Sequence, residues 1–219
     1  MIRAFDIIFS IFVIILLMPL FFIISIILKF SGEKEIFYKQ ERIGMRQKKF
    51  QVYKFTTMKK GSENLGSGSI TLKGDDRVFL FGKFLRFTKL NEFPQLINVL
   101  LGEMSFVGPR PLMIRQFNYY SESEKKIIAS VRPGITGLGS ILFRDEEKIL
   151  SKHNNPHDFY KTNISPVKAA VEMEFISRRN IFLYFSIIIL TLVSVILPQI
   201  RFGYLVNKEL RERYECLYR

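Results

Sequence analysis

The sequence has little cysteine and lacks the motifs of several common classes of site. Its one cysteine, Cys216, cannot form an intramolecular disulfide bond and offers no thiol pair to a metal, which agrees with a reducing compartment. His153 and His157 lie four residues apart, but the proline between them disrupts the helical spacing of a zinc site. The chain has no Gly-x-x-x-x-Gly-Lys-Ser/Thr segment, so phosphate-loop ATPase chemistry is not supported.

The composition indicates a globular part with an additional apolar part. A length of 219 residues suits one domain of ordinary size, and an apolar fraction of 48% with a net charge of +13 argues against disorder and against an all-membrane protein. The positive charge suits either nucleic acid or an anionic membrane surface. No recognised nucleic-acid motif is present, whereas each basic residue near an anionic leaflet contributes about 1 kcal/mol of attraction. We therefore expect a lipid bilayer, and no nucleic acid, as a partner.

The first apolar run, residues 7–28, contains no charged residue. At about 1.5 Å per residue, a helix of this length just crosses a hydrocarbon core of about 30 Å. Pro19 removes one helical hydrogen bond and clashes with the carbonyl group of Ile15, which predicts a kink or reversal. Arg3 and Lys29 flank the run, as expected when both ends face the cytoplasm. These features predict a re-entrant membrane anchor over residues 1–30, and the run is too long for a cleaved signal peptide.

A second apolar run, residues 181–197, is shorter, at roughly 25 Å if helical. If this run crossed the bilayer, the basic tail that follows would lie outside the cell, against the positive-inside tendency. We expect a helix that lies in or dips into the membrane interface, with a buried core helix as the alternative. The predicted organisation is therefore an anchor over 1–30, a cytoplasmic domain over 31–178, and an apolar helix with a basic tail over 179–219.

Within the central domain, the fold class is predicted as α/β, mainly helical with a small β-hairpin. Apolar and polar residues alternate on both sides of Gly44, which is typical of a hairpin. Residues 59–76 are rich in glycine and serine and indicate a loop. From Asn91 to Gly102 the pattern is helical, with Asn91 as a good N-cap residue and Glu92 in the first turn.

Three arginines occupy segments rich in proline, glycine or acidic residues. Arg110 stands between two prolines, Arg132 lies in "VRPGITG", and Arg144 lies in "LFRDEE". Prolines fix the direction of a neighbouring guanidinium group, and a fixed guanidinium near a helix N-terminus suits a diphosphate. The adjacent carboxylates are able to hold Mg²⁺. Together with a membrane anchor, these residues indicate phosphate chemistry on a lipid.

Several segments of the chain resemble those of a known protein family. The segments "YKQERIG", "FQVYKFTTM", "GKFLR", "NEFPQLINVLLGEMSFVGPRP" and "VRPGITG" resemble those of the bacterial sugar transferases, which are monotopic polyprenyl-phosphate phosphoglycosyl transferases. The resemblance runs from about Phe5 to about Arg144 and continues weakly to about Ile181. It implies transfer of a sugar 1-phosphate from a nucleotide-activated sugar, usually a UDP-sugar, to undecaprenyl phosphate, with Mg²⁺ as cofactor. That reaction is the first membrane step in building many surface glycans.

The resemblance also implies a fold, a location and further site residues. The fold implied is a re-entrant membrane helix, amphipathic interfacial helices and a small α/β part on the cytoplasmic face of the inner membrane. Lys54 and Arg86 fall inside matched segments and become candidate phosphate contacts. The identity of the sugar is left open, as is the oligomeric state, with a homodimer among the options.

One departure from the family concerns its adjacent Asp and Glu, in which the Asp attacks phosphorus and the Glu helps to place Mg²⁺. The Asp position is Asn91 here, and an amide cannot form the same acyl phosphate. Three interpretations stay open. In the first, Glu92 is the nucleophile and other carboxylates, such as Asp76 or Glu103, hold Mg²⁺. In the second, both substrates bind together and react directly. In the third, the chain is a catalytically silent homologue that binds polyprenyl phosphate or scaffolds glycan enzymes.

The candidate site residues follow from these arguments. The catalytic candidates are Glu92 and Asn91, and the metal candidates are Glu92 and Asp76. The substrate-binding candidates share a cationic side chain and are Lys54, Arg86, Arg110, Arg132 and Arg144.

Overall fold

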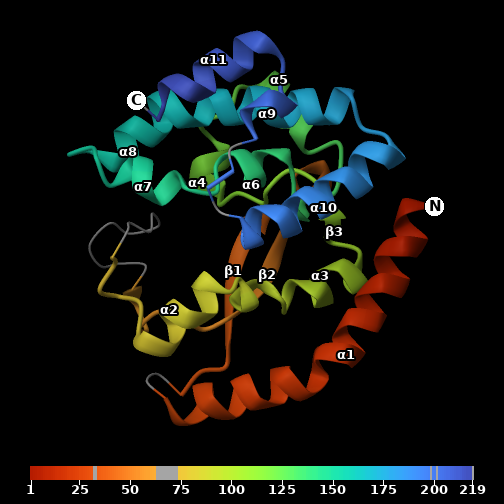
Figure 1. The fold of residues 1–219 in the computed structure, drawn as a ribbon, viewed down its shortest axis with the longest axis vertical. Helices are drawn as coiled ribbons and strands as arrows, with labels where there is room; N and C mark the ends of the chain where they lie inside the picture. The colour runs from red at the N-terminus through yellow and green to blue at the C-terminus, as the bar shows by residue number, and fades with distance from the viewer. Residues whose placement is uncertain (32–33, 63–73, 198, 201, 219) are drawn as a thin grey trace.

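In the computed structural model, which describes residues 1–31, 34–62, 74–197, 199–200 and 202–218, the fold is mainly helical with two small sheets. An antiparallel hairpin of β1 (Phe37–Ile43) and β2 (Lys49–Phe55) runs through the middle of the molecule (Figure 1). Helix α1 (Ile2–Phe30) lies at one end of this hairpin, and α9 (Ser165–Ser177) lies at the other. The mainly helical class and the hairpin are confirmed.

The hairpin follows the alternation expected from the sequence. Ile43 pairs with Lys49 across the turn that begins at Gly44 and contains the short 3-10 helix η1 (Met45–Gln47). Phe50 and Val52 of β2 are buried against Val99 and Met104. This packing fixes β2, and Lys54 near its end, relative to the helix that follows the candidate residues Asn91 and Glu92.

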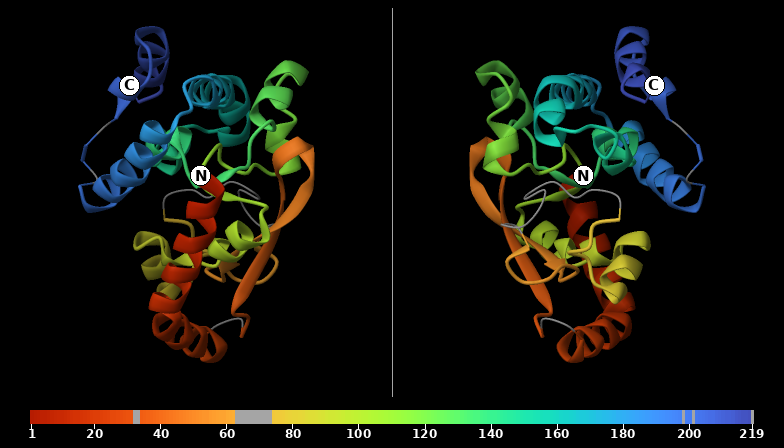
Figure 2. Two further views of the ribbon diagram at one scale, coloured as in Figure 1. Left: turned by 90° about the vertical axis from the view of Figure 1, so that its right-hand side faces the viewer. Right: turned by 90° about the vertical axis from the view of Figure 1, so that its left-hand side faces the viewer.

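Helix α1 continues through Pro19 as one element and bends, so that its two halves run in different directions (Figures 1 and 2). The bend agrees with the kink expected at the proline, and no chain reversal into two antiparallel arms occurs. Among the described residues, α1 is the one helix with the length and hydropathy to cross a membrane. Its middle exposes large apolar side chains, which include Ile8, Phe12, Ile15, Leu16, Met18, Phe22 and Ile23.

Both ends of α1 are attached to the rest of the protein. Near the N-terminus, Asp6 is buried and accepts hydrogen bonds from the hydroxyl group of Ser105, the backbone N–H of Phe106 and the hydroxyl group of Tyr184. Near the C-terminus of the helix, Ile24 and Leu28 are buried in a cluster with Phe55 and Leu85. The exposed middle of α1 therefore lies between two anchored ends.

The segment after α2 (Leu80–Phe87) differs from the sequence prediction at Asn91. Asn91 lies in the 3-10 turn η3 (Leu90–Glu92), and α3 (Gln95–Leu101) begins only after Pro94, which occupies the N-cap position. The interpretation of Asn91 as the N-cap is wrong, because η3 separates it from α3. Gly102 ends α3 with a positive φ of 84°, as the sequence predicts.

A parallel pair of short strands, β3 (Ser105–Val107) and β4 (Gly134–Thr136), was not predicted from the sequence. It places the loops that carry Arg110 and Arg132 side by side. The approach is very close, since a Cβ atom added to Gly108 would lie 2.3 Å from the carbonyl oxygen of Arg132. This explains the glycine that follows β3, because any side chain there would push the two loops apart.

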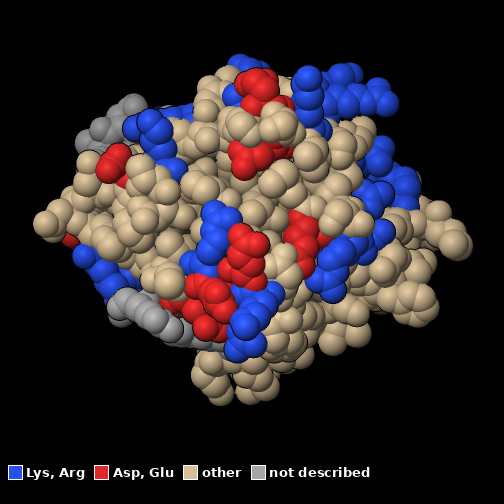
Figure 3. All heavy atoms as spheres, turned by 90° about the horizontal axis from the view of Figure 1, so that it is seen from above, with Lys and Arg blue, Asp and Glu red and all other residues tan. Residues whose placement is uncertain are grey.

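The remaining helices form the layer at the α9 end. They are α4 (Ile114–Phe117), α5 (Glu122–Ile128), α6 (Leu138–Leu142), α7 (Glu146–Leu150), α8 (Pro156–Phe159), the π-helical turn η4 (Tyr160–Ile164), α10 (Ile181–Ile196), the 3-10 turn η5 (Gly203–Leu205) and α11 (Lys208–Cys216). Their core includes Tyr160, Val171, Phe175, Tyr184 and Tyr214. Seen from this end, the surface carries Lys and Arg interspersed with Asp and Glu (Figure 3).

Helix α10, the second apolar run, is partly buried in the core of the protein. Tyr184 and Ile187 on one face are buried in the core, whereas Phe182, Ile189 and Leu192 are exposed. Of the predicted loop over residues 59–76, residues 63–73 lie outside the described residues. The described end of that loop is held by Arg77, which donates hydrogen bonds to Asp75.

Candidate functional site

A cleft of about 660 Å³ opens between the hairpin, the η3 turn and the helices of the α9 layer. Most of the residues selected from the sequence line it, although they come from distant parts of the chain. They are Lys54, Arg86, Asn91, Glu92, Arg110 and Arg144. The cleft is therefore the place where the predicted catalytic and phosphate-binding residues meet.

Glu92 is held between two cations. Its Oε1 atom accepts hydrogen bonds from Nζ of Lys54 at 3.1 Å and from a guanidinium nitrogen of Arg110 at 3.2 Å. Burial alone would raise the pKa of Glu92, but Lys54 and Arg110 outweigh burial and hold the pKa well below its usual range. Glu92 is thus a carboxylate at any physiological pH, with one oxygen already committed to two donors.

The cations around Glu92 repel one another. Burial, and then the charges of Arg110 and Arg42, lower the pKa of Lys54 to about 8, although Glu92 acts in the opposite direction. Burial and the charge of Arg110 similarly lower the pKa of Arg42 to about 10. Among the described residues that line the cleft, lysine and arginine side chains outnumber the four glutamates, so the cleft favours an anion.

Asn91 lies beside Glu92 in the cleft wall and is 8% exposed. Among the residues that the structure describes, no hydrogen-bond partner reaches its buried Oδ1 atom. A buried amide oxygen without a partner is costly, so a group bound in the cleft is a candidate partner for it. The side chain cannot attack phosphorus in the way a carboxylate does.

Arg86 and Arg144 also line the cleft, and each contacts other protein groups. The Nε of Arg86 donates to the hydroxyl group of Thr57 at 3.0 Å, and Glu147 lies 4.0 Å from its guanidinium group. Arg144 donates to the carbonyl group of Ser194 at 2.7 Å and so links the cleft to the end of α10. Both guanidinium groups are oriented by protein contacts before any ligand binds.

Arg132 and Asp76 are not brought to the cleft. The Nε of Arg132 donates to the carbonyl oxygen of Gly102 at 2.8 Å, at the C-terminal end of α3. That contact suits the negative end of the helix dipole, and Arg132 is not among the residues that line the cleft. Asp76 is exposed and does not line the cleft.

Several cleft residues were not selected from the sequence. Arg42, within "YKQERIG", donates to the carbonyl group of Pro111 and supports the loop of Arg110. Lys168 of α9 pairs with Glu146 and lies 5.3 Å from the ring centre of Tyr160. Because Arg42 lies in the family-like segment "YKQERIG", the sequence alone could have indicated it as a candidate site residue. No local pattern marks Lys168 or Tyr160, because only the packing of η4 and α9 brings them to the cleft.

Comparison with known proteins agrees with this site. A family model described as "Bacterial sugar transferase" matches residues 1–198. The exopolysaccharide production protein ExoY of Rhizobium meliloti (strain 1021) is 36% identical over an alignment of 158 residues that covers 66% of this chain and 70% of that protein.

Two longer relatives are named UDP-glucose:undecaprenyl-phosphate glucose-1-phosphate transferase. The one from Klebsiella pneumoniae is 39% identical over 153 residues, which are 68% of this chain and 33% of that protein. The one from Escherichia coli (strain K12) is 36% identical over 160 residues, which are 72% of this chain and 34% of that protein. The family match covers most of the chain and includes every residue of the cleft described above. The chain belongs to the bacterial sugar transferase family.

Proposed function

We propose that the protein transfers a sugar 1-phosphate from a UDP-sugar to undecaprenyl phosphate at the cytoplasmic face of the inner membrane, and so begins the assembly of a surface glycan. The observation that carries this proposal is the arrangement of Lys54, Arg42 and Arg110 around the carboxylate of Glu92, in a cleft whose cationic side chains outnumber its glutamates. A diphosphate supplies the negative charge that these cations lack. The names of the longer relatives support the same donor and acceptor.

The apolar surface supports the location of the reaction. Large apolar side chains are exposed on α1, on α2 at Leu80 and Phe87, and on α10 at Phe182. An exposed apolar surface of this extent on a soluble protein would promote aggregation, whereas a membrane covers it. Helix α1 is held at both ends by the same globular part, which supports a re-entrant path with both ends in the cytoplasm.

The cleft also suits Mg²⁺. This ion prefers oxygen ligands, and proteins usually bind it through one or two side chains while substrate phosphates and water complete the shell. The unpartnered amide oxygen of Asn91, next to the carboxylate of Glu92, provides such a pair. When bound, Mg²⁺ neutralises charge on the donor diphosphate. Asn91 and Glu92 would hold the ion, and Asp76 is not needed for it.

The chemistry that fits Asn91 is direct transfer. Glu92 is a weak nucleophile here, because two cations engage its oxygen and lower its basicity. An oxygen of undecaprenyl phosphate therefore attacks the β-phosphorus of the UDP-sugar, and the bond from that phosphorus to the bridging oxygen breaks. The products are UMP and undecaprenyl diphosphate sugar. Lys54 and Arg110 stabilise the charge on the transferred phosphate.

Asn91 also favours a second candidate function. A chain without the family's nucleophile is suited to bind polyprenyl phosphate, or to scaffold other glycan enzymes, without catalysis. Phosphate-binding arginines serve this function equally well.

The two candidates are separated by a transfer assay with the purified full chain in lipid nanodiscs. Undecaprenyl phosphate and Mg²⁺ are supplied with each member of a panel of radiolabelled UDP-sugars. The proposed function predicts a labelled lipid with at least one donor, formed together with an equal amount of UMP. Absence of labelled lipid with every nucleotide sugar, together with retained binding of undecaprenyl phosphate, would favour the non-catalytic function.

A further inference from the structure

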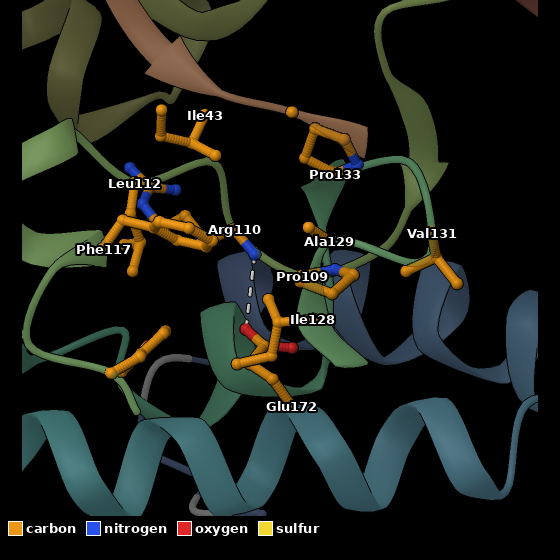
Figure 4. A pocket seen from close by; sticks show the side chains of 12 residues that line it. Ile43, Pro109, Arg110, Leu112, Phe117, Ile128, Ala129, Val131, Pro133 and Glu172 are labelled. Carbon is orange, nitrogen blue, oxygen red and sulfur yellow. Dashed lines mark hydrogen bonds between the residues drawn. The ribbon is translucent and has the colours of Figure 1, made fainter. Parts of the chain in front are cut away.

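The loop that presents Arg110 to the cleft is supported from behind by a buried carboxyl group. Glu172 of α9 is 4% exposed, and its Oε1 atom accepts a hydrogen bond of 3.3 Å from the backbone N–H of Arg110 (Figure 4). The guanidinium group of the same arginine reaches Glu92. Arg110 is therefore held at its backbone by one carboxyl group while its side chain contacts another.

The surroundings of Glu172 are shaped to admit this carboxyl group. A Cβ atom added to Gly139 of α6 would lie 2.4 Å from Oε1 of Glu172, so the carboxyl group occupies the space that a side chain at residue 139 would need. A cavity of about 20 Å³ beside Glu172 and Arg110 is large enough for one water molecule. Among the described residues, no protein group bonds the other carboxyl oxygen, Oε2.

A buried polar group at this position is costly unless it has a role. An apolar residue would fill the same space without the desolvation penalty of a carboxyl group. Prolines on either side restrict the local conformations of Arg110, so the loop shifts as one stiff unit if the N–H bond to Glu172 is lost. The position of its guanidinium group then depends on the anchor at Glu172.

We propose that Glu172 is a positioning residue that fixes the Arg110 loop through the backbone N–H of Arg110, and so sets the affinity of the cleft for the donor diphosphate. The inference deepens the proposed function and rests on it for the nature of the ligand. Glu172 lines the small cavity beside the Arg110 loop and is not among the residues that line the cleft, so it does not contact a donor bound in the cleft.

The protonation of Glu172 gives the proposal a pH dependence. Burial raises the pKa of Glu172 to about 7, against the opposing effects of the Arg110 N–H, of Lys168 on the same helix and of the Arg110 side chain. Tyr120, whose own pKa burial raises, also faces the group. Above pH 7 the ionised carboxylate accepts the stronger, charge-assisted hydrogen bond. Below pH 7 protonation weakens that bond, so donor affinity falls as the pH is lowered.

The first test needs no donor. Hydrogen exchange of the full chain in nanodiscs is followed by mass spectrometry for the peptide over residues 106–113, where Arg110 carries one of the few amide protons. Glu172→Met removes the acceptor while preserving bulk, and we expect exchange in this peptide to rise about tenfold. Gly139→Ala displaces the carboxyl group while leaving Glu172 chemically intact, and we expect a smaller rise. Exchange that stays at the wild-type rate in Gly139→Ala and in a folded Glu172→Met would overturn the proposal.

The second test measures equilibrium binding of UDP-glucose and UDP-galactose between pH 6 and 8, without acceptor lipid. These donors do not change charge in that range, whereas a phosphate monoester does. In the wild type we expect affinity to fall severalfold below pH 7. Glu172→Gln keeps a neutral oxygen acceptor and should bind donor weakly at every pH, with no such fall.

The two tests separate the inference from the proposed function. A wild type that binds no nucleotide sugar at pH 8 contradicts the proposed function, and hydrogen exchange still decides whether Glu172 fixes the loop. A wild type whose donor affinity does not change with pH, or a Glu172→Gln variant with the wild-type profile, contradicts the inference alone. If Glu172→Met fails to fold, hydrogen exchange of Gly139→Ala and donor binding by Glu172→Gln decide whether the inference holds.

Discussion

The Nζ atom of Lys54 lies 3.1 Å from Oε1 of Glu92, and both side chains are less than a fifth exposed. Lys54 comes from the end of a β-strand, and Glu92 comes from a 3-10 turn that the packing of β2 against α3 places beside it. The pair joins an anion to a cation whose pKa burial brings close to the physiological range. We therefore expect donor binding in the cleft to depend on pH through Lys54.

Donor use should decline above pH 8 because Lys54 loses its proton there. Its pKa is lowered to about 8, so the free protein carries the cation below that value and loses it above. kcat/KM for the donor reports the free protein and should fall about tenfold for each pH unit above 8. In Lys54→Arg the cation persists, so kcat/KM should stay level to pH 9.5. A wild-type profile that stays level, or a Lys54→Arg profile that declines equally, would exclude Lys54 as the titrating group.

Replacing Asn91 by aspartate should change the kinetic mechanism. The wild type is expected to form no covalent adduct with donor alone, because it lacks a competent nucleophile. Asn91→Asp introduces a carboxylate beside Glu92, and we expect mass spectrometry to detect a sugar-phosphate adduct on it when only donor is present. The matched control is Asn154→Asp, which changes an exposed amide. A covalent adduct on Glu92 of the wild type would contradict direct transfer.

Asp6 should contribute strongly to the attachment of α1. It is 2% exposed and accepts hydrogen bonds from Ser105, Phe106 and Tyr184, which belong to β3 and α10. Asp6→Asn converts charge-assisted hydrogen bonds into neutral ones and places a donor where acceptors are needed. We expect a loss of about 1–3 kcal/mol in the free energy of unfolding in detergent. Asp158→Asn, at an exposed position, should leave that free energy unchanged.

The re-entrant path of α1 is testable by labelling. In a Cys216→Ser background, Ala4→Cys places a single thiol at an exposed position near the N-terminus, and Ser123→Cys places one in the globular part. A membrane-impermeant thiol reagent should label neither variant in cells with an intact inner membrane and should label both after permeabilisation. Labelling of Ala4→Cys alone in intact cells would show that α1 crosses the bilayer.

The elements predicted successfully from the sequence have strong local patterns. Alternation around Gly44 marks the hairpin, an uncharged run marks α1, and Gly102 marks the end of α3. The candidate residues Lys54, Glu92 and Arg110 were selected through their motifs, and the structure brings their side chains into contact.

The errors arise where tertiary contacts decide. Asn91 has a high N-cap propensity, but a 3-10 turn intervenes and Pro94 takes that position. Arg132 lies in a motif like that of Arg110, yet its guanidinium group turns to the carbonyl group of Gly102. Glu172 lies in an ordinary helical pattern, and only the packing of α9 behind the Arg110 loop reveals its contact. Residue type and spacing do not determine such contacts between distant segments.

The most direct test of the central claim is the effect of Glu92→Gln on transfer. The substitution keeps the size of the side chain but removes the one negative charge held by Lys54 and Arg110. With UDP-sugar, undecaprenyl phosphate and Mg²⁺ at saturating concentrations, we expect the rate of lipid labelling to fall at least 100-fold, or about 3 kcal/mol in activation free energy. The control Glu209→Gln, on the exposed surface of α11, should retain the wild-type rate. Full transfer activity in Glu92→Gln would contradict the proposal that this cleft is the catalytic site.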